Sequence, residues 1–588
     1  MRWRELWLLI STAFRAAPWH FVASLPGPIV ALAYPLLGFW LKFITDAVVA
    51  HDSSRSAVGV AGLLGTIVAR WAVDYLCTAV QTTLAERVGF AFDDEILRLT
   101  AEIPTLDHWG RPDFRDRLEL LRQAQGALGA SLTALTHALS AIVCAAGTLV
   151  LLAMVHPLLL LLVVFALPAI PLATAQQRWR ADAEECSAEP ARLARHLRGL
   201  MVDPRAGMEL RIFRWRADVQ TRYRAAAADA ARPLIRAQIR GALAGAAQDM
   251  LFTAAFIGTV GFVLWRAAHG HAEAGDVILA VVVCRQVQQA ILWPVQSVAG
   301  LGEALRAAGR LLWLRAYASA TRSTGRNAPA RIRSGLDFEH VWFRYPGGER
   351  WILRDLSIHI PAGAVVALVG ENGSGKSTIV NLLARFYEPT SGRILLDGVD
   401  LAELDPHNLR TRMSAAFQDF VRFELAAGHA VGIGELSRLA DPIAVGSALE
   451  RAGAADLPNG LPAGLATQLG ARWPGGVDLS TGQWQKIALG RALIRADPLL
   501  LFLDEPTASL DAHTEHALFE RYAAAARGRA RSGAVTVLVS HRFSTVRSAD
   551  VIVVLDDGRI IERGSHAELI KQGGRYAELY ALQADSYK

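Results

Sequence analysis

Cysteine and lysine are scarce in this chain of 588 residues, which holds four Cys and five Lys. The cysteines, Cys77, Cys144, Cys186 and Cys284, lie far apart without CxxC spacing, so the sequence indicates neither a disulfide framework nor a zinc site. Charged residues make up 20% and hydrophobic residues 52%, which excludes a disordered or fibrous protein and disfavours a wholly soluble one. The net charge of +6 is too small to indicate nucleic-acid binding.

Long apolar stretches fill the first half of the chain and are absent from the second half. Each is near the roughly 20 residues that cross a bilayer as a helix. The segment Met1–Phe14 alternates Arg with Trp and Leu at helical spacing, so we expect an interfacial helix rather than a cleaved signal sequence. We predict six spans at about residues 20–43, 57–81, 132–155, 156–177, 242–265 and 276–297.

Arginine is distributed unevenly among the segments between these spans. Segments 82–131 and 178–240 are rich in Arg, whereas 44–56, 156–157 and 266–275 carry almost none. The positive-inside rule therefore predicts a multi-pass protein of the inner (cytoplasmic) membrane, with both long segments and both termini in the cytoplasm. The long segments lack strand patterning, which favours helices continuing beyond the bilayer over small inserted soluble domains.

Several polar residues lie within the predicted spans. Arg70 and Asp74 are four residues apart and can pair on one helix face, which favours a structural role. Charges at membrane depth are costly, so such residues face a protein interior or a wet cavity. Asp249 is one further example, and Arg285, Gln286, Gln288 and Gln289 form a cluster that either lines a pathway or packs.

The composition turns polar after Tyr317 and then alternates β-rich runs with amphipathic helical stretches. The predicted fold is therefore a membrane α-helical domain of six spans with long cytoplasmic helical extensions, followed by an α/β P-loop nucleotide-binding domain. We place the transmembrane domain at 1–316, a linker at 317–334 and the nucleotide-binding domain at 335–588.

A glycine-rich turn in the second half links an apolar strand at 365–369 to an apolar helix from Ile379. Backbone N–H groups in such a turn wrap phosphate oxygens at a helix N-terminus. Lys376 is expected to reach the β- and γ-phosphates, and the Ser377 hydroxyl to ligate Mg²⁺. The predicted phosphate-binding residues are Gly370, Asn372, Gly373, Ser374, Gly375, Lys376, Ser377 and Thr378.

A second apolar run, Leu499–Leu503, ends in two carboxylates, Asp504 and Glu505. A buried parallel strand would deliver Asp504 to the metal at its carboxyl end. Glu505 can then polarise the attacking water as the general base. The alternative is that the two acidic residues only end a strand, and the presence of a phosphate loop in the same domain disfavours it.

Three more motifs complete a resemblance. Leu479-Ser480-Thr481-Gly482-Gln483 lies between the two elements above, and Ser509-Leu510-Asp511 and Ser540-His541 follow them. This half of the chain, about 335–580, resembles the nucleotide-binding domain of ATP-binding-cassette (ABC) transporters, whose signature is LSGGQ. The first 320 residues resemble, more weakly, the membrane half of an ABC exporter half-transporter. The resemblance implies ATP and Mg²⁺ as cofactors and coupled ATP hydrolysis.

The resemblance also implies roles for matching residues. Tyr345 would stack on adenine, Gln418 would touch Mg²⁺ and sense the membrane domain, and the catalytic His541 would hold the γ-phosphate. Asp511 would communicate across a dimer. Ser480, Gly482 and Gln483 would close on ATP bound to the opposite cassette, and the helix that follows them supplies a second anion site.

Thr481 departs from the signature by standing at its first glycine. A β-branched residue there is expected to restrict φ and to add bulk near the partner's phosphate. In the family, an altered signature in one half of some heterodimers accompanies a mate without the catalytic Glu. Because this chain has Glu505 and His541, we favour a homodimer and leave a heterodimer with a second half-transporter open.

Two stretches of the membrane half, Asp107–Glu119 and Gly207–Phe213, resemble the coupling helices of exporters. The stretches around Gln418 and Thr481 are similar to cassettes of bacterial lanthipeptide and other peptide exporters. We therefore expect ATP-driven export of a substrate, such as a peptide or natural product, by alternating access. A lipid flippase, an ATP-gated channel and a regulatory membrane ATPase remain alternatives; membrane lipid and the transported substrate are the other expected partners.

Overall fold

The structure is a computed structural model that describes residues 2–322, 325–505, 533–540 and 546–586. The chain divides into two compact units. The first unit comprises Met1–Arg98 and Glu119–Leu314, and the second comprises Leu99–Leu118 and Arg315–Lys588. The second unit therefore includes a short piece of the membrane half of the sequence together with the whole described cassette.

Six helical segments are long and apolar enough to cross a membrane, judged by length and composition. Each segment contains one of the predicted spans, except that the predicted span 156–177 begins one residue before its segment, at His156. The segment Ser53–Glu102 is one helix of 50 residues, or about 75 Å at the usual rise, so it exceeds the roughly 30 Å of a bilayer core. The segments are Pro18–Val49, Ser53–Glu102, Ser131–Val155, Pro157–Val202, Arg216–Ala268 and Ala274–Thr321.

The first segment differs from the continuous helix that the sequence predicts, because three short or medium helices share it. Pro26 and Pro28 lie at the break, and proline removes a backbone donor and clashes with the preceding turn. The predicted tight turn at His156-Pro157 is present as a 3₁₀ turn, in which His156 Nδ1 accepts a hydrogen bond from Leu158 N at 3.1 Å.

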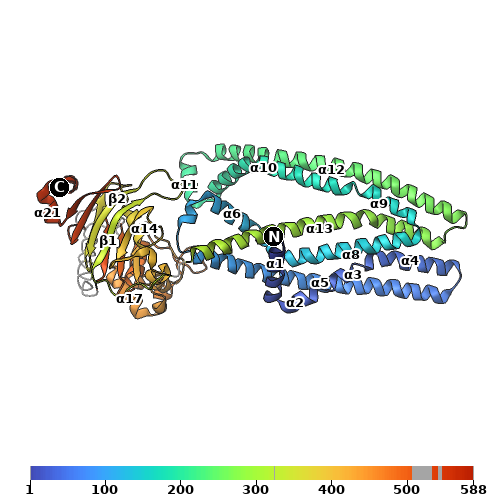
Figure 1. The fold of residues 1–588 in the computed structure, drawn as a ribbon, viewed down its shortest axis with the longest axis horizontal. Coiled ribbons are helices and arrows are strands. Elements are labelled where there is room, and N and C mark those ends of the chain that lie inside the picture. The colour runs from blue at the N-terminus through green and yellow to red at the C-terminus, as the bar shows by residue number, and fades with distance from the viewer. Residues whose placement is uncertain (1, 323–324, 506–532, 541–545, 587–588) are drawn as a thin grey trace. The chain divides into compact units, whose positions relative to one another are not determined.

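The helices of the membrane half pack lengthwise. Figure 1 shows α10 and α12 running side by side. The Gln176 side chain of α10 donates to Gly241 O of α12 at 2.8 Å, and buried Gln248 donates to Phe165 O at 2.8 Å. The helices are α1 (Arg2–Ala16), α2 (Pro18–Ser24), α3 (Gly27–Val30), α4 (Ala33–Val49), α5 (Ser53–Glu102), α6 (Pro112–Gln123), α7 (Gln125–Gly129), α8 (Ser131–Val155), α9 (Leu161–Ala166), α10 (Ala169–Val202), α11 (Pro204–Ile212), α12 (Arg216–Ala268) and α13 (Ala274–Thr321), with 3₁₀ turns η1 (Asp107–Gly110) and η2 (Pro157–Leu160).

Two sheets build the cassette. The smaller has the strand order β2-β1-β4-β5, and its paired strands are antiparallel. The larger has the order β10-β9-β3-β8-β7-β6 and is parallel except for β10. The strands are β1 (Gly335–Phe343), β2 (Leu353–Pro361), β3 (Val365–Gly370), β4 (Ser391–Leu396), β5 (Val399–Asp400), β6 (Met413–Ala416), β7 (Leu500–Asp504), β8 (Val535–Val539), β9 (Val551–Asp556) and β10 (Arg559–Gly564).

The central strands of the larger sheet read as continuous apolar runs because both of their faces are buried. One core joins the two sheets and α14, and another lies beneath the helices at the far side of the larger sheet. The parallel strands β3 and β7 therefore end at the same edge. The cassette helices are α14 (Lys376–Leu383), α15 (Pro406–Arg410), α16 (Ala427–Gly432), α17 (Pro442–Arg451), α18 (Thr481–Leu493), α21 (His566–Gln572) and α22 (Arg575–Ser586), with 3₁₀ turns η3 (Leu401–Glu403), η4 (Leu436–Arg438), η5 (Leu457–Gly460) and η6 (Gly464–Ala466).

Candidate nucleotide-binding site

The predicted phosphate loop connects β3 to α14. Gly370 and Gly375 have φ of 154° and 104°, a region that favours glycine. A Cβ at Gly370 would lie 2.2 Å from Leu555 O, and one at Gly375 would lie 2.6 Å from Leu353 Cδ2. Gly373, with φ of 85°, faces open space. The loop therefore packs tightly on its protein side and leaves a free backbone surface on the other.

Lys376 folds back onto this loop. Its Nζ donates to the carbonyl oxygens of Gly370 and Glu371, each at 2.8 Å. Burial lowers the pKa of Lys376, although the carboxylates of Glu505 and Asp504 act in the opposite direction. The lysine is thus held by main-chain oxygens that phosphate oxygens can replace.

Asp504 ends β7 and is buried, with 6% of its surface exposed. Burial raises the pKa of Asp504, and a hydrogen bond from Ser377 opposes that effect. Asp504 Oδ1 has no hydrogen-bond partner within the described part of the chain. A hydroxyl beside a buried, under-coordinated carboxylate is the hard-oxygen donor set that Mg²⁺ prefers. Ser377 and Asp504 therefore fit the predicted metal site.

Glu505 follows Asp504 directly, in a left-handed backbone conformation with φ of 45°. Its N–H donates to Val539 O of β8 at 3.0 Å, and its Oε2 accepts from Gln418 Nε2 at 2.9 Å. Left-handed backbone at a non-glycine residue is a strained state that persists where the surroundings impose it. The structure thus brings Gln418 and Glu505 together, as the predicted site requires.

Tyr345 lies beside the loop, with its hydroxyl 3.1 Å from Thr378 Oγ1. Its ring meets Phe343 and Tyr387 edge to face, with centroids 5.0 Å and 5.1 Å apart. These contacts fix the ring next to the phosphate loop. Stacking of adenine on Tyr345 remains a prediction.

The signature turn caps α18. Ser480 is the N-cap, and a capping box joins it to Gln483, with Ser480 N donating to Gln483 Oε1 at 2.9 Å. Thr481 is the first residue of the helix, a backbone conformation that β-branched residues can adopt. Thr481 is exposed, and only its bulk distinguishes it from glycine at the surface. Gly482 follows within the first turn.

Asn372 and Ser374 lie in the loop itself, and the Ser374 hydroxyl is buried. Two predicted site residues, His541 and Asp511, lie outside the described residues. The remaining predicted residues of one cassette, from Gly370 to Thr378 with Tyr345, Gln418, Asp504 and Glu505, occupy one region at the carboxyl ends of β3 and β7.

One contact at the loop has no counterpart in the sequence reasoning. Arg575, at the start of α22, donates from Nη2 to Glu371 Oε1 at 2.6 Å. The backbone N–H groups of Arg575 and Tyr576 both donate to the Glu562 carboxylate, and Tyr576 is fully buried. The C-terminal helix is therefore anchored and reaches the phosphate loop. More than 200 intervening residues hide this pairing from local pattern reasoning.

The first predicted coupling segment, at η1, belongs to the same unit as the cassette. Leu106 N donates to Phe386 O at 2.8 Å, and Arg410 Nη2 donates to Pro104 O at 2.6 Å. Asp107 lines a pocket of about 520 Å³ together with Tyr345 and Glu388. Burial, assisted by the Glu388 carboxylate, raises the pKa of Asp107.

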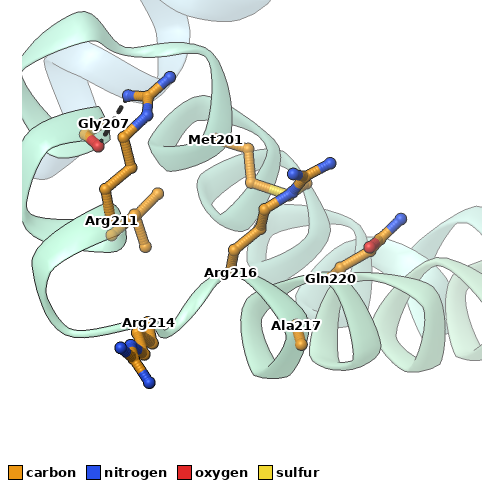
Figure 2. Close-up of a pocket in the computed structure, with 8 residues that line it drawn as sticks. Met201, Gly207, Arg211, Arg214, Arg216, Ala217 and Gln220 are labelled. Carbon is orange, nitrogen blue, oxygen red and sulfur yellow. Dashed lines mark hydrogen bonds between the residues drawn. The ribbon is translucent and has the colours of Figure 1, made fainter.

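The second predicted coupling segment, around α11, belongs to the first unit. It borders a pocket of about 960 Å³ between the ends of α10 and α12, shown in Figure 2. Arg211 Nη1 donates to Gly207 O at 2.9 Å, and Ile212 and Phe213 are 75% and 72% exposed. The end of α11 therefore presents two adjacent exposed apolar side chains.

These features define a class: a six-span membrane domain joined to a P-loop α/β cassette. Residues 353–508 match the ABC transporter family model. The fold is similar to that of a bacterial Atm1-family ABC exporter solved with ATP bound, with a TM-score of 0.73, 26% identity and coverage of 97% of this chain and 98% of that chain.

Two curated relatives are named ATP-dependent lipid A-core flippases. The protein of Ralstonia nicotianae is 44% identical over 255 residues, 43% of this chain and 41% of the relative. That of Pseudomonas aeruginosa is 35% identical over 326 residues, 55% of this chain and 51% of the relative. The alignments thus span about half, or less, of each relative's length.

The chain carries an ABC transporter domain and has the fold of an ABC exporter half-transporter. The predicted fold class and the predicted cofactors, ATP and Mg²⁺, are confirmed. It is a multi-pass membrane protein.

Proposed function

We propose that the chain is an ATP-driven exporter that works as a dimer by alternating access. The observation that carries the proposal is the joining of Gln418 to Glu505 at 2.9 Å beside the buried Asp504, in a chain with six candidate spans. Such a site performs phosphoryl transfer to water. Because the site is joined to a membrane domain, the free energy of ATP hydrolysis can drive a conformational change of that domain.

Glu505 is the proposed general base. Gln418 orients its carboxylate, which takes a proton from the attacking water as that water adds to the γ-phosphorus. The bond from this phosphorus to the bridging oxygen breaks, and ADP leaves with that oxygen. Lys376 leaves the carbonyls of Gly370 and Glu371 to neutralise the β- and γ-phosphates. Ser377 and Asp504 would hold Mg²⁺, which would supply charge neutralisation for the phosphates. His541 holds the γ-phosphate in this proposal.

Two copies complete the site. The signature turn at Ser480 presents the N-terminus of α18 to the phosphates of the other cassette, because a helix N-terminus favours anions. Thr481 begins a regular helix, so it does not distort this turn. We therefore propose a homodimer with two equivalent sites. The alternative is a heterodimer with a second half-transporter that lacks the catalytic Glu.

The two coupling segments connect ATP to the membrane half. The first sits on the cassette through Leu106 and Pro104. The second exposes Ile212 and Phe213 and is proposed to insert into a cassette. We place the cassettes and both termini in the cytoplasm and the spans in the inner membrane, in line with the Arg-rich extensions.

We propose an amphiphilic cargo, with a lipid favoured over a peptide. The curated relatives at 44% and 35% identity carry lipid flippase names, whereas peptide export has no support from them.

The test is purification of this chain alone and assay of ATP hydrolysis in nanodiscs. A stable, hydrolysing dimer supports the proposal, whereas a chain that stays inactive until a second half-transporter is added overturns the homodimer. Acyl-labelled lipid moving across proteoliposomes only with ATP supports a flippase. Ion conductance on ATP binding, without turnover, favours the channel instead.

A further inference from the structure

Arg285 is an unpaired cation at membrane depth. It lies on α13, eleven residues beyond Ala274, or about 16 Å along a helix, which is near the middle of a bilayer core of about 30 Å. Its side chain is exposed, and over the described residues it makes no hydrogen bond or ion pair. An unpaired guanidinium facing hydrocarbon is costly, so this surface faces water, a ligand or a protein.

Arg70 provides a contrast inside the same unit. Its Nε donates to Asp74 Oδ2 at 3.3 Å, and its guanidinium lies 3.8 Å from the centroid of the Tyr34 ring. Both partners belong to this chain, so Arg70 is satisfied structurally, as the sequence suggested. The same chain therefore neutralises one intramembrane arginine and leaves another open.

A carboxylate of α12 is linked to the turn of α13 that carries Arg285. Asp249 of α12 accepts a hydrogen bond from Gln288 Nε2 at 2.5 Å, and Gln288 lies one turn from Arg285 on α13. Arg285 and Asp249 make no ion pair. Asp249 is exposed, as is Gln289, which lies four residues beyond Arg285 on the helix. Two opposite charges, both exposed, are thus linked through Gln288 at membrane depth.

Exposed apolar side chains lie near these residues along both helices. Met250 and Leu243 on α12 are 73% and 68% exposed, and Val281 lies one turn from Arg285. Gln286 does not belong to the open surface, because its amide donates to Tyr34 O at 3.2 Å and so ties α13 to α4. The polar site therefore consists of Arg285, Gln289, Gln288 and Asp249, and exposed apolar side chains of α12 and α13 lie near it.

We propose that this site binds the zwitterionic head of an amphiphile, with the anionic group on Arg285 and Gln289 and the cationic group on Asp249. A zwitterion satisfies both charges at once, whereas an anion leaves Asp249 facing it and a neutral head satisfies neither. The exposed apolar side chains of α12 and α13 accommodate the hydrocarbon chain. This proposal deepens the proposed export function and rests on it for its physiological meaning, but binding itself needs no ATP.

The experiment measures binding to the full-length protein in uncharged maltoside micelles without nucleotide. The probes are single-chain amphiphiles of equal acyl length: lysophosphatidylethanolamine (zwitterion), lysophosphatidylglycerol (anion) and monoacylglycerol (neutral). Dissociation constants come from the rise of the thermal midpoint with ligand concentration. The proteins are the parent, Arg285→Gln, Arg285→Lys, Asp249→Asn and, as the matched control, Arg70→Gln.

The parent is expected to bind the zwitterion most tightly. Arg285→Gln should weaken both phosphate-bearing probes by about tenfold, the scale of a lost charge-assisted hydrogen bond, while Arg285→Lys keeps most of the affinity. Asp249→Asn should keep anion binding and lose the preference for the zwitterion. Arg70→Gln should retain the parent's order of affinities.

Three results would overturn the proposal. One is an unchanged order of affinities in Arg285→Gln, and another is tighter binding of the anion than of the zwitterion by the parent. The third is loss of the dimer in Arg285→Gln, measured by mass, because Arg285 would then contact the second copy. Absence of ATP hydrolysis in the parent would instead contradict the proposed function and leave these binding results intact.

Discussion

The cassette and the membrane half hold their charged groups by different means. In the cassette, the backbone carbonyls of its own loop hold Lys376, and Ser377 at the start of α14 donates a hydrogen bond to Asp504 at the end of β7. In the membrane half, Lys42 of α4 meets Asp276 and Glu273, which are more than 200 residues away in the sequence. Short motifs thus supply the side chains of the catalytic site and the parallel sheet brings the motifs together, whereas helix packing builds the polar sites among the spans.

The largest expected effect is on ATP hydrolysis at the cassette site. Glu505→Gln removes the proposed base while preserving the shape, so ATP hydrolysis should fall about 10²–10⁴-fold with ATP binding retained. The measurement is phosphate release by the full dimer, together with nucleotide binding. Glu450→Gln, an exposed glutamate on α17, is the matched control. Hydrolysis by Glu505→Gln at the parent's rate would refute the base assignment.

In the membrane half, removing a partly buried charge should change the stability of the protein rather than ATP hydrolysis. Lys42 lies 3.6 Å from Glu273 and 3.8 Å from Asp46, and it also pairs with Asp276. Lys42→Met would leave three carboxylates facing one another, so the free energy of unfolding should fall by about 1–2 kcal/mol after allowance for partial exposure. Thermal denaturation measures this.

The control for that change is Arg55→Met. Arg55 is 71% exposed, and its single carboxylate partner, Asp52, lies 3.4 Å away. Exposed ion pairs contribute little, so this variant should denature close to the parent. Equal losses in Lys42→Met and Arg55→Met would show that the four-residue cluster adds nothing.

The ion pair between Arg575 of α22 and Glu371 of the phosphate loop is expected to affect the affinity of the loop for ATP. Arg575→Gln or Glu371→Gln should raise KM for ATP about twofold to fivefold with kcat kept, because the loop loses a lateral support. The exchanged pair, Glu371→Arg with Arg575→Glu, should recover KM. Glu578→Gln, which removes the other partner of Arg575, is the control. A KM unchanged in both single variants would contradict the coupling.

The smallest effect concerns pH and Asp107. Burial raises the pKa of Asp107 above its ordinary value of 3.8, so the protonated form favours the fold and that contribution is lost as pH rises through the raised pKa. Asp107→Asn should therefore raise stability at pH 7 by about 0.5 kcal/mol or less, and the gain should vanish below about pH 4. Thermal midpoints across this range provide the test. A gain that persists at low pH would point to packing instead.

Sequence reasoning predicted the motif-based parts of the site because each depends on neighbours in the chain. A glycine-rich turn between an apolar strand and a helix can be recognised from nine residues, and Asp504 and Glu505 follow one apolar run. The expected effect of Thr481 stays a prediction, and the structure shows that this residue starts a regular helix. The pairing of Arg575 with Glu371 had no local signal.

The amino-acid sequence by itself determined the six apolar segments, the cassette and its nucleotide motifs, because hydrophobicity and short spacings act along the chain. Only the tertiary structure decided which intramembrane charges are satisfied. Arg70 finds Asp74 one turn away and the Tyr34 ring of another helix, whereas Arg285 finds no partner in the part of the chain described. Charge at membrane depth is costly wherever it stands, but whether a partner reaches it depends on helix packing, which periodicity does not encode.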